Sequence, residues 1–274
     1  MFFGWLRSRR RAAIEQASFP SAWETILRRN VLHAAWLGED ARDRLRGFVN
    51  VFLAEKRFEG CGGLAVDDEV RVTIAALAGV AMAGFRGEYL DHLRSILVYP
   101  GDYRASRSTP LAGGGVLEWE EPRLGETWLG GSMVLSWPRV LEGGRFRGGG
   151  ENLLVHEWAH ALDAADGEVD GVPPLASPRA RRRWAGEFAA SMERFMVRLD
   201  DGRAVPLDPY AAESPAEFFA VASECFFQDP HRLVRFDRSL HGLLVEAWRQ
   251  DPAGWIPRRG TRLRAEVAEE IVEF

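Results

Sequence analysis

Apolar positions in the first third of the chain recur with the spacing of amphipathic helices. From residue 20 to about residue 86, apolar side chains stand three and four positions apart, as in the run from Leu45 to Leu53. This period predicts three helices in the region. Gly60–Gly63 interrupts the pattern, and the acidic pair Asp67–Asp68 is placed to cap the helix that follows.

The pattern changes in the middle of the chain. Three short segments there are rich in β-branched, aromatic and other large apolar residues, and glycine or proline separates them. Segments of this kind are typical of strands. We therefore predict a sheet of three or more strands that contains Ser95–Tyr99, Gly115–Trp119 and Met133–Trp137.

Helix-start signals mark the rest of the chain. Asn152 can cap a helix that runs to about Ala165 and stops at Gly167. Two further helices begin where a capping hydroxyl is followed by a proline at the first helical position, at Ser177-Pro178 and at Ser214-Pro215. A helical C-terminal region completes this prediction.

Composition narrows the classes of protein. The chain has 274 residues, 46% of them hydrophobic and 27% charged, which is the profile of a soluble globular protein. Its formal net charge of -5 gives no bulk attraction to nucleic acid or to an anionic membrane. The two cysteines show no metal-binding or redox spacing, so the sequence favours a reducing compartment.

The N-terminus does not have the order of a secretory signal, because its charges follow a very short apolar stretch. No later segment has the roughly 18 uninterrupted apolar residues of a membrane span. We expect a cytoplasmic protein with no nucleic-acid and no membrane partner. Residues 1–11 are expected to fray, with contact to a membrane or a protein as the alternative.

The helix that follows Asn152 carries candidate chemistry. It contains His156-Glu157-Trp158-Ala159-His160, an HExxH motif. At 3.6 residues per turn, both histidines lie on one face and can reach one zinc ion. Glu157 points about 100° away around the axis. It can therefore stand beside a zinc-bound water as a general base without taking a coordination position.

The alternative is two half-buried histidines on a core helix, because leucine and valine flank the motif. We favour the metal, since two imidazoles and a carboxylate in so apolar a helix need compensation, and a divalent cation supplies it. A structural metal, or none, is a third hypothesis. It is weakened because the motif brings no fourth protein ligand.

A catalytic zinc needs a third protein ligand and an open position. Asp166 occupies the position at which the metzincins have a further histidine. Asp163 shares the face of the two histidines, but it lies one turn further along and would make a strained ligand. We assign Asp163 a role beside the ligands or at the helix terminus, with an exposed acid near a helix end as the equal alternative.

Better candidates lie in the segment from Tyr210 to Phe227. Glu217 and Glu224 are seven residues apart and hence on one helical face among phenylalanines, where carboxylates need a partner. Glu217 also fits a capping box with Ser214. That explanation covers Glu224 less well, and nothing in the local sequence explains Tyr210.

The paired motifs HEWAHALD and YAAESPAEFFAVASECFF resemble the Mlc titration factor A family of bacterial zinc-dependent peptidases. The catalytic core of that family is similar to that of the anthrax lethal factor protease. The resemblance spans residues 20 to 245 and is looser toward the N-terminus. It implies a predominantly helical, zincin-like α+β fold with a small sheet, one Zn²⁺ per chain, and hydrolysis of a peptide or protein substrate.

The resemblance also implies roles for single residues. It makes Glu217 the third zinc ligand of a gluzincin site, and it makes Tyr210 the residue that faces the reacting carbonyl. Glu224 matches a recurrent acid, which we assign to orienting a ligand histidine, with a helix-surface glutamate as the alternative. Met133–Trp137 is placed either as the edge strand that binds extended substrate or as an ordinary core strand.

A second class of function is protein binding, because the family takes its name from sequestering a glucose-responsive transcriptional repressor. A repressor partner is therefore a hypothesis beside peptide hydrolysis, and the two are compatible. The arginine cluster Arg179–Arg183 can attract acidic partners, although a solvated helix face is the favoured interpretation.

No internal repeat, low-complexity tract or flexible linker divides the chain. We therefore predict one compact domain over residues 20–250. The predicted parts are an N-terminal arm at 1–19, a helical region at 20–90, a sheet at 95–140, site helices at 151–228, and a C-terminal tail or helix at 251–274.

Overall fold

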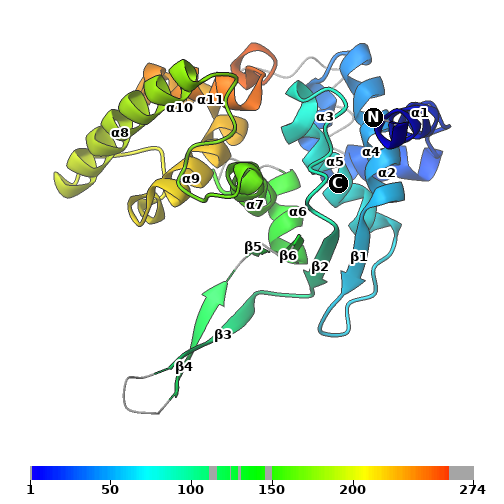
Figure 1. Ribbon diagram of the computed structural model, residues 1–274, viewed down its shortest axis with the longest axis horizontal. Coiled ribbons are helices and arrows are strands. Elements are labelled where there is room, and N and C mark those ends of the chain that lie inside the picture. The colour runs from blue at the N-terminus through cyan, green and yellow to red at the C-terminus, as the bar shows by residue number, and fades with distance from the viewer. Residues whose placement is uncertain (1, 111–115, 124, 129–130, 146–149, 259–274) are drawn as a thin grey trace.

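A small mixed sheet lies between two groups of helices in the computed structural model (Figure 1), which describes residues 2–110, 116–123, 125–128, 131–145 and 150–258. The strand order is β1-β2-β6-β5, with the first three strands parallel and β5 antiparallel to β6. The bounds are β1 (Arg57–Gly60), β2 (Ser95–Tyr99), β5 (Gly125–Trp128) and β6 (Ser132–Ser136). Together with the surrounding helices, the sheet makes an α+β fold, as predicted.

β6 is an interior strand of this sheet. It pairs with β2 on one side, with Ile96 opposite Met133, and with β5 on the other. Met133 and Leu135 are fully buried. The interpretation of Met133–Trp137 as an edge strand is therefore wrong, and the core-strand alternative is right. β5, which precedes β6 in the chain, pairs with it and occupies that edge.

β3 (Tyr103–Pro110) and β4 (Val116–Arg123) form a separate antiparallel ribbon, and Figure 1 shows it extending away from the helices. The strand predicted at Gly115–Trp119 falls within β4 from Val116 onward, whereas Gly115 lies outside the described residues. Its predicted place in one sheet with Ser95–Tyr99 and Met133–Trp137 is wrong, because β4 pairs with β3 and not with β2 or β6. β1 was not predicted, because three of its four residues are exposed and no apolar alternation marks it.

The N-terminal group contains four α-helices and one short 3₁₀-helix over residues 20–86, where the sequence predicted three helices. The additional boundary falls at Val31, whose extended φ of -128° ends one helix and starts the next without interrupting the apolar pattern. The bounds are α2 (Ser21–Asn30), α3 (Leu32–Trp36), α4 (Glu39–Glu55), α5 (Asp68–Ala81) and η1 (Met82–Gly84). As predicted, Asp67 caps α5 by accepting a hydrogen bond from the Val70 amide.

α1 (Phe2–Glu15) occupies the segment that was expected to fray. It packs on α4, and the buried Arg11 guanidinium pairs with Glu55 at 2.6 Å and also with Asp91. Both acids belong to distant parts of the chain. The local sequence therefore gave no sign of the contacts that hold this helix.

The C-terminal group begins at the capping residues that the sequence identified. Asn152, Ser177 and Ser214 each accept a hydrogen bond from the amide three residues later. Gly167 ends the first of these segments with a left-handed φ of +98°. The bounds are α6 (Trp137–Arg145), α7 (Leu153–Asp163), η2 (Ala164–Asp166), α8 (Pro178–Asp200), η3 (Pro209–Ala212), α9 (Pro215–Gln228), α10 (Pro230–Phe236), α11 (Arg238–Trp248) and η4 (Pro252–Gly254).

α7 lies at the centre of the molecule, with α9 on one side and β5 and β6 on another (Figure 1). Trp158 of α7 and Phe218 and Phe219 of α9 are fully buried in a core that continues through both groups of helices. No helix among the described residues has the length and apolarity that crossing a bilayer requires. The fold thus holds α7 between a helix and a sheet.

Candidate metal centre

α7 brings its two histidines together on one face. Nε2 of His156 and Nε2 of His160 are 3.2 Å apart, and the ring centroids are 4.8 Å apart. The helix is fixed at its start by the Asn152 cap and along its length by buried neighbours such as Leu154 and Trp158. Both imidazoles therefore present one nitrogen to the same point.

Glu217 reaches this point from the first turn of α9. Its Oε2 lies 3.1 Å from Nε2 of His156 and 3.4 Å from Nε2 of His160. Oε2 is nevertheless buried without a hydrogen-bond partner among the described residues. Within that part of the chain, these three residues form the group whose donor atoms could hold a metal ion.

The three donor atoms fit a tetrahedral zinc ion. Ligands at about 2.0–2.1 Å from zinc in tetrahedral geometry stand about 3.3–3.4 Å from one another. The separations of 3.1, 3.2 and 3.4 Å match that triangle. Two nitrogens and a carboxylate oxygen are also the donor types that zinc prefers. A buried oxygen without a hydrogen bond is the group that such an ion would satisfy.

Without a metal, the pKa values of His156 and Glu217 are shifted by their contacts with charged neighbours. Burial lowers the pKa of His156, but its contacts with the Glu217 and Glu224 carboxylates outweigh burial and raise that pKa to about 10. Burial raises the pKa of Glu217, but the two histidines outweigh it and hold that pKa well below its usual range. The metal-free site thus favours an imidazolium beside a carboxylate.

Glu224 lies about two helical turns after Glu217 on the same face of α9. It contacts the other ring nitrogen of His156, Nδ1. Nδ1 of His156 donates to Oε1 of Glu224 at 2.8 Å. The second carboxylate oxygen accepts a hydrogen bond from the backbone amide of Asn152, the capping residue of α7. One buried carboxylate therefore holds both the start of α7 and the orientation of an imidazole.

Glu157 and Tyr210 both act on or lie near His156 but differ in exposure. Glu157 is 2% exposed, and its negative charge contributes to the raised pKa of His156. Tyr210, on η3, is 46% exposed, and its ring centroid lies 6.3 Å from that of His156. The Glu157 carboxylate is therefore shielded from solvent, whereas the Tyr210 phenol is half exposed near the His156 ring.

Asp163 is fully buried and is not part of the three-residue group. Its Oδ2 accepts a hydrogen bond from the Gly171 amide at 2.8 Å, and burial raises its pKa to about 6. The exposed-acid alternative is therefore wrong, because the chain after α7 folds back over the end of the helix. Asp163 lies at the helix terminus and fixes that return.

Two contributions were missed from the sequence. The backbone amide of Asn152, which donates to Glu224, left no pattern because every residue type except proline supplies one. Gly171 has a φ of +78°, its carbonyl accepts from Nε1 of Trp184, and an added Cβ would lie 2.5 Å from the Pro215 carbonyl. Only its type as a glycine hinted at this close approach of α7, α8 and α9.

A helix bearing HExxH beside a small sheet in a mostly helical α+β fold is the architecture of a zincin-like metallopeptidase. Comparison with known proteins agrees with that class, because the sequence profile of the glucose-regulated metallo-peptidase M90 family matches residues 5–249. The chain belongs to this family.

Individual relatives span nearly the same length. An uncharacterized protein of Synechocystis, slr2042, is 32% identical over 238 residues, which are 86% of each chain. Mlc titration factor A of Yersinia pestis is 29% identical over 246 residues, 89% of each chain, and that of Yersinia pseudotuberculosis shows the same values. Similarity thus extends through the sheet, the site helices and most of the C-terminal group.

Proposed function

We propose that this chain is a zinc-dependent peptidase of the gluzincin type, with His156, His160 and Glu217 as the metal ligands. The observation that carries the proposal is the triangle of donor atoms with 3.1 to 3.4 Å edges, one of them a buried oxygen without a hydrogen bond among the described residues. Membership of a metallopeptidase family supports it independently.

The chain's residues divide the chemistry among them. Bound zinc supplies a Lewis acid that polarises the scissile carbonyl and lowers the pKa of water to about 7. Glu157 takes a proton from the attacking water and delivers it to the departing amine nitrogen. Tyr210 donates a hydrogen bond to the carbonyl oxygen as negative charge develops there, an effect of about 3 kcal/mol for one such donor elsewhere.

β5 is the proposed binding edge for an extended peptide. Among the described strands it pairs with β6 alone, and it lies beside α7. Its outer edge presents backbone donors and acceptors that an added strand can use. A peptide paired there would run along the side of the sheet on which β5 lies beside α7.

The experiment compares three zinc-loaded proteins on a mixed peptide library, with cleavage sites determined by mass spectrometry. The wild type and Glu187→Gln, a change at an exposed acid on α8, are expected to cleave the same bonds. Glu157→Gln is expected to retain one zinc per chain and to lose cleavage by about 100-fold or more. Zinc content is measured for each protein before the assay.

Cleavage by Glu157→Gln at the wild-type rate would overturn the assigned base. If none of the three proteins cleaved any peptide while all held stoichiometric zinc, the peptidase proposal would fail. Loss of zinc from Glu217→Gln, with the fold retained by circular dichroism, is expected and separates the ligand assignment from the assignment of Glu157.

Binding of a repressor is a second proposed function. It is supported by the Yersinia relatives, which are named as titration factors of Mlc and share 89% of their length with this chain. A cytoplasmic location accompanies it. We expect a purified Mlc-type repressor to form a complex with Glu157→Gln as tightly as with the wild type, measured by isothermal titration calorimetry. Absence of any complex with either protein would contradict this function.

A further inference from the structure

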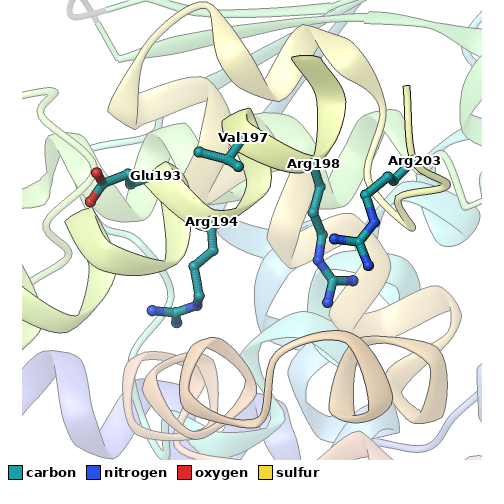
Figure 2. Close-up of a pocket in the computed structure, with 5 residues that line it drawn as sticks. All are labelled: Glu193, Arg194, Val197, Arg198 and Arg203. Carbon is teal, nitrogen blue, oxygen red and sulfur yellow. The ribbon is translucent and has the colours of Figure 1, made fainter. Parts of the chain in front are cut away.

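A pocket on the C-terminal half of α8 lies on elements other than those that supply the candidate ligands. It has a volume of about 350 Å³ and is lined by Glu193, Arg194, Val197, Arg198 and Arg203. The last of these follows α8 on the segment that leads to η3. Figure 2 shows the three guanidinium groups pointing to one side of the pocket, whereas the Glu193 carboxylate points away from them. The lining is therefore strongly basic in a chain whose net charge is -5.

The three arginines differ in how their charge is compensated. Arg194 pairs with Asp237 at 2.6 Å and also donates to Oγ of Ser191. Arg198 lies over the ring of Phe236, 5.1 Å from its centroid, and neither Arg198 nor Arg203 has an acidic partner in the described part of the chain. The backbone amide of Arg203 donates to the Arg198 carbonyl, which keeps the two residues together.

At the other end of α8, two arginines are paired with acids. Within the cluster Arg179–Arg183, which the sequence brought to attention, Arg181 pairs with Asp166 and Arg183 pairs with Glu246. Those charges are compensated by the protein itself. Arg198 near the end of α8 and Arg203 just after it have no such acidic partner among the described residues, and two neighbouring cations in one pocket create a site for a carboxylate.

Apolar side chains accompany this basic pocket. Val197 lines it with 54% of its surface exposed, and its neighbour Met196 is 41% exposed. Large exposed apolar side chains beside unpaired arginines fit a partner that supplies acidic and apolar residues together. Single-stranded nucleic acid is a poorer match, since none of the five lining residues is aromatic and Glu193 would repel phosphates.

We propose that this pocket is a docking site for an acidic segment of a protein partner, with Arg198 and Arg203 binding carboxylates and Val197 contacting an apolar side chain between them. The site is independent of peptide hydrolysis. The bound acidic segment lies next to the chain that continues from Arg203 into η3.

The test uses the full chain and fluorescein-labelled peptides of defined composition, followed by fluorescence anisotropy at low ionic strength. The probe alternates glutamate pairs with leucine. A charge-reversed peptide with lysine in place of glutamate and an acidic peptide with glycine in place of leucine are the comparison peptides. We expect the probe to bind at least tenfold more tightly than the charge-reversed peptide and measurably more tightly than the glycine peptide.

Two double variants separate this pocket from general electrostatics. Arg198→Glu with Arg203→Glu is expected to weaken probe binding by tenfold or more. Arg179→Glu with Arg182→Glu makes the same change in net charge at exposed positions of the same helix, and it should leave binding within about twofold. Glu193→Gln removes the repelling charge of the pocket and is expected to tighten binding, a gain that misfolding cannot produce.

Equal weakening by both double variants would overturn the proposal, and so would an absence of probe binding to the wild type. Displacement of the probe by inorganic phosphate, at a concentration where equal ionic strength of chloride has no effect, would indicate a phosphate site instead. Stronger competition by a single-stranded oligonucleotide than by the unlabelled probe would assign the pocket to nucleic acid.

Discussion

Glu224 fixes the imidazole of His156 through a hydrogen bond in which Nδ1 of the ring donates to Oε1 of the carboxylate at 2.8 Å. This contact leaves Nε2 directed at the point where Nε2 of His160 and Oε2 of Glu217 also converge. Carboxylates in this position fix the tautomer and the ring orientation of metal-binding histidines, and they increase the basicity of the other nitrogen. If a metal is bound as proposed, Glu224 therefore acts on it without touching it.

Replacing Glu224 should weaken zinc binding more than it weakens the fold. Loss of such an orienting carboxylate elsewhere costs about 10–100-fold in metal affinity, so we expect a decrease of that size for Glu224→Gln. The measurement is competition for zinc with a chromophoric chelator. Glu213→Gln, at an exposed acid just before α9, is the control and should retain wild-type affinity. Equal affinities of wild type and Glu224→Gln would contradict the role.

Gly171 should tolerate no side chain. Gly171→Ala combines a left-handed φ of +78° with a Cβ 2.5 Å from the Pro215 carbonyl. The matched control is Gly202→Ala, where φ is +65° and a Cβ would meet nothing within 4 Å. We expect a loss of about 1–2 kcal/mol from backbone strain in the control. Overpacking should increase that to about 2–4 kcal/mol for Gly171→Ala. Urea unfolding tests both, and equal losses would show that the Pro215 contact relaxes.

Asp163 should make stability depend on pH. Burial raises its pKa from about 3.8 to about 6 in the folded chain, so the folded state keeps this proton where the unfolded chain has lost it. The carboxyl therefore favours folding fully below about pH 4, and this contribution is lost as the pH rises through 6.

Asp163→Asn removes this titration. As the pH rises from 4 to 7.5, the free energy of unfolding of Asp163→Asn should increase relative to that of the wild type by about 2–3 kcal/mol. The measurement is urea unfolding of both chelator-treated proteins at each pH. Parallel pH profiles for the two proteins would contradict the assignment.

Zinc removal should destabilise the wild type and leave a ligand variant unaffected. Saturating a folded-state site at 1,000 times its dissociation constant adds about 4 kcal/mol. We therefore expect a chelator to lower the Tm of the wild type by several degrees and to leave the Tm of His160→Ala unchanged. Calorimetry with and without zinc measures both. Identical Tm values for zinc-loaded and chelated wild type would argue against the site.

The parts of the fold that the sequence predicted correctly rest on local rules. His156 and His160 share a face because the helical period alone places them there, and no distant residue is needed for that conclusion. The caps at Asn152, Ser177 and Ser214 are equally local, since each hydroxyl or amide binds an amide three residues later.

The parts that escaped prediction rest on contacts between distant segments. The burial of Asp163 depends on the segment around Gly171 returning over the end of α7. The position of α1 on the fold depends on the ion pairs of Arg11 with Glu55 and Asp91. The interior place of β6 depends on β5 pairing back onto it, which no property of Met133–Trp137 reveals. Neighbouring residues do not encode such pairings.

The three candidate ligands come from α7 and α9, and the whole of α8 lies between these helices in the chain. An ion held by His160 and Glu217 would thus cross-link two points of a long loop and reduce the conformational entropy of the unfolded chain, as a disulfide does. During synthesis, the three donors are complete only after residue 217 has emerged and α9 has packed on α7. Under the proposed ligand assignment, the full set of metal donors is therefore assembled only late in synthesis.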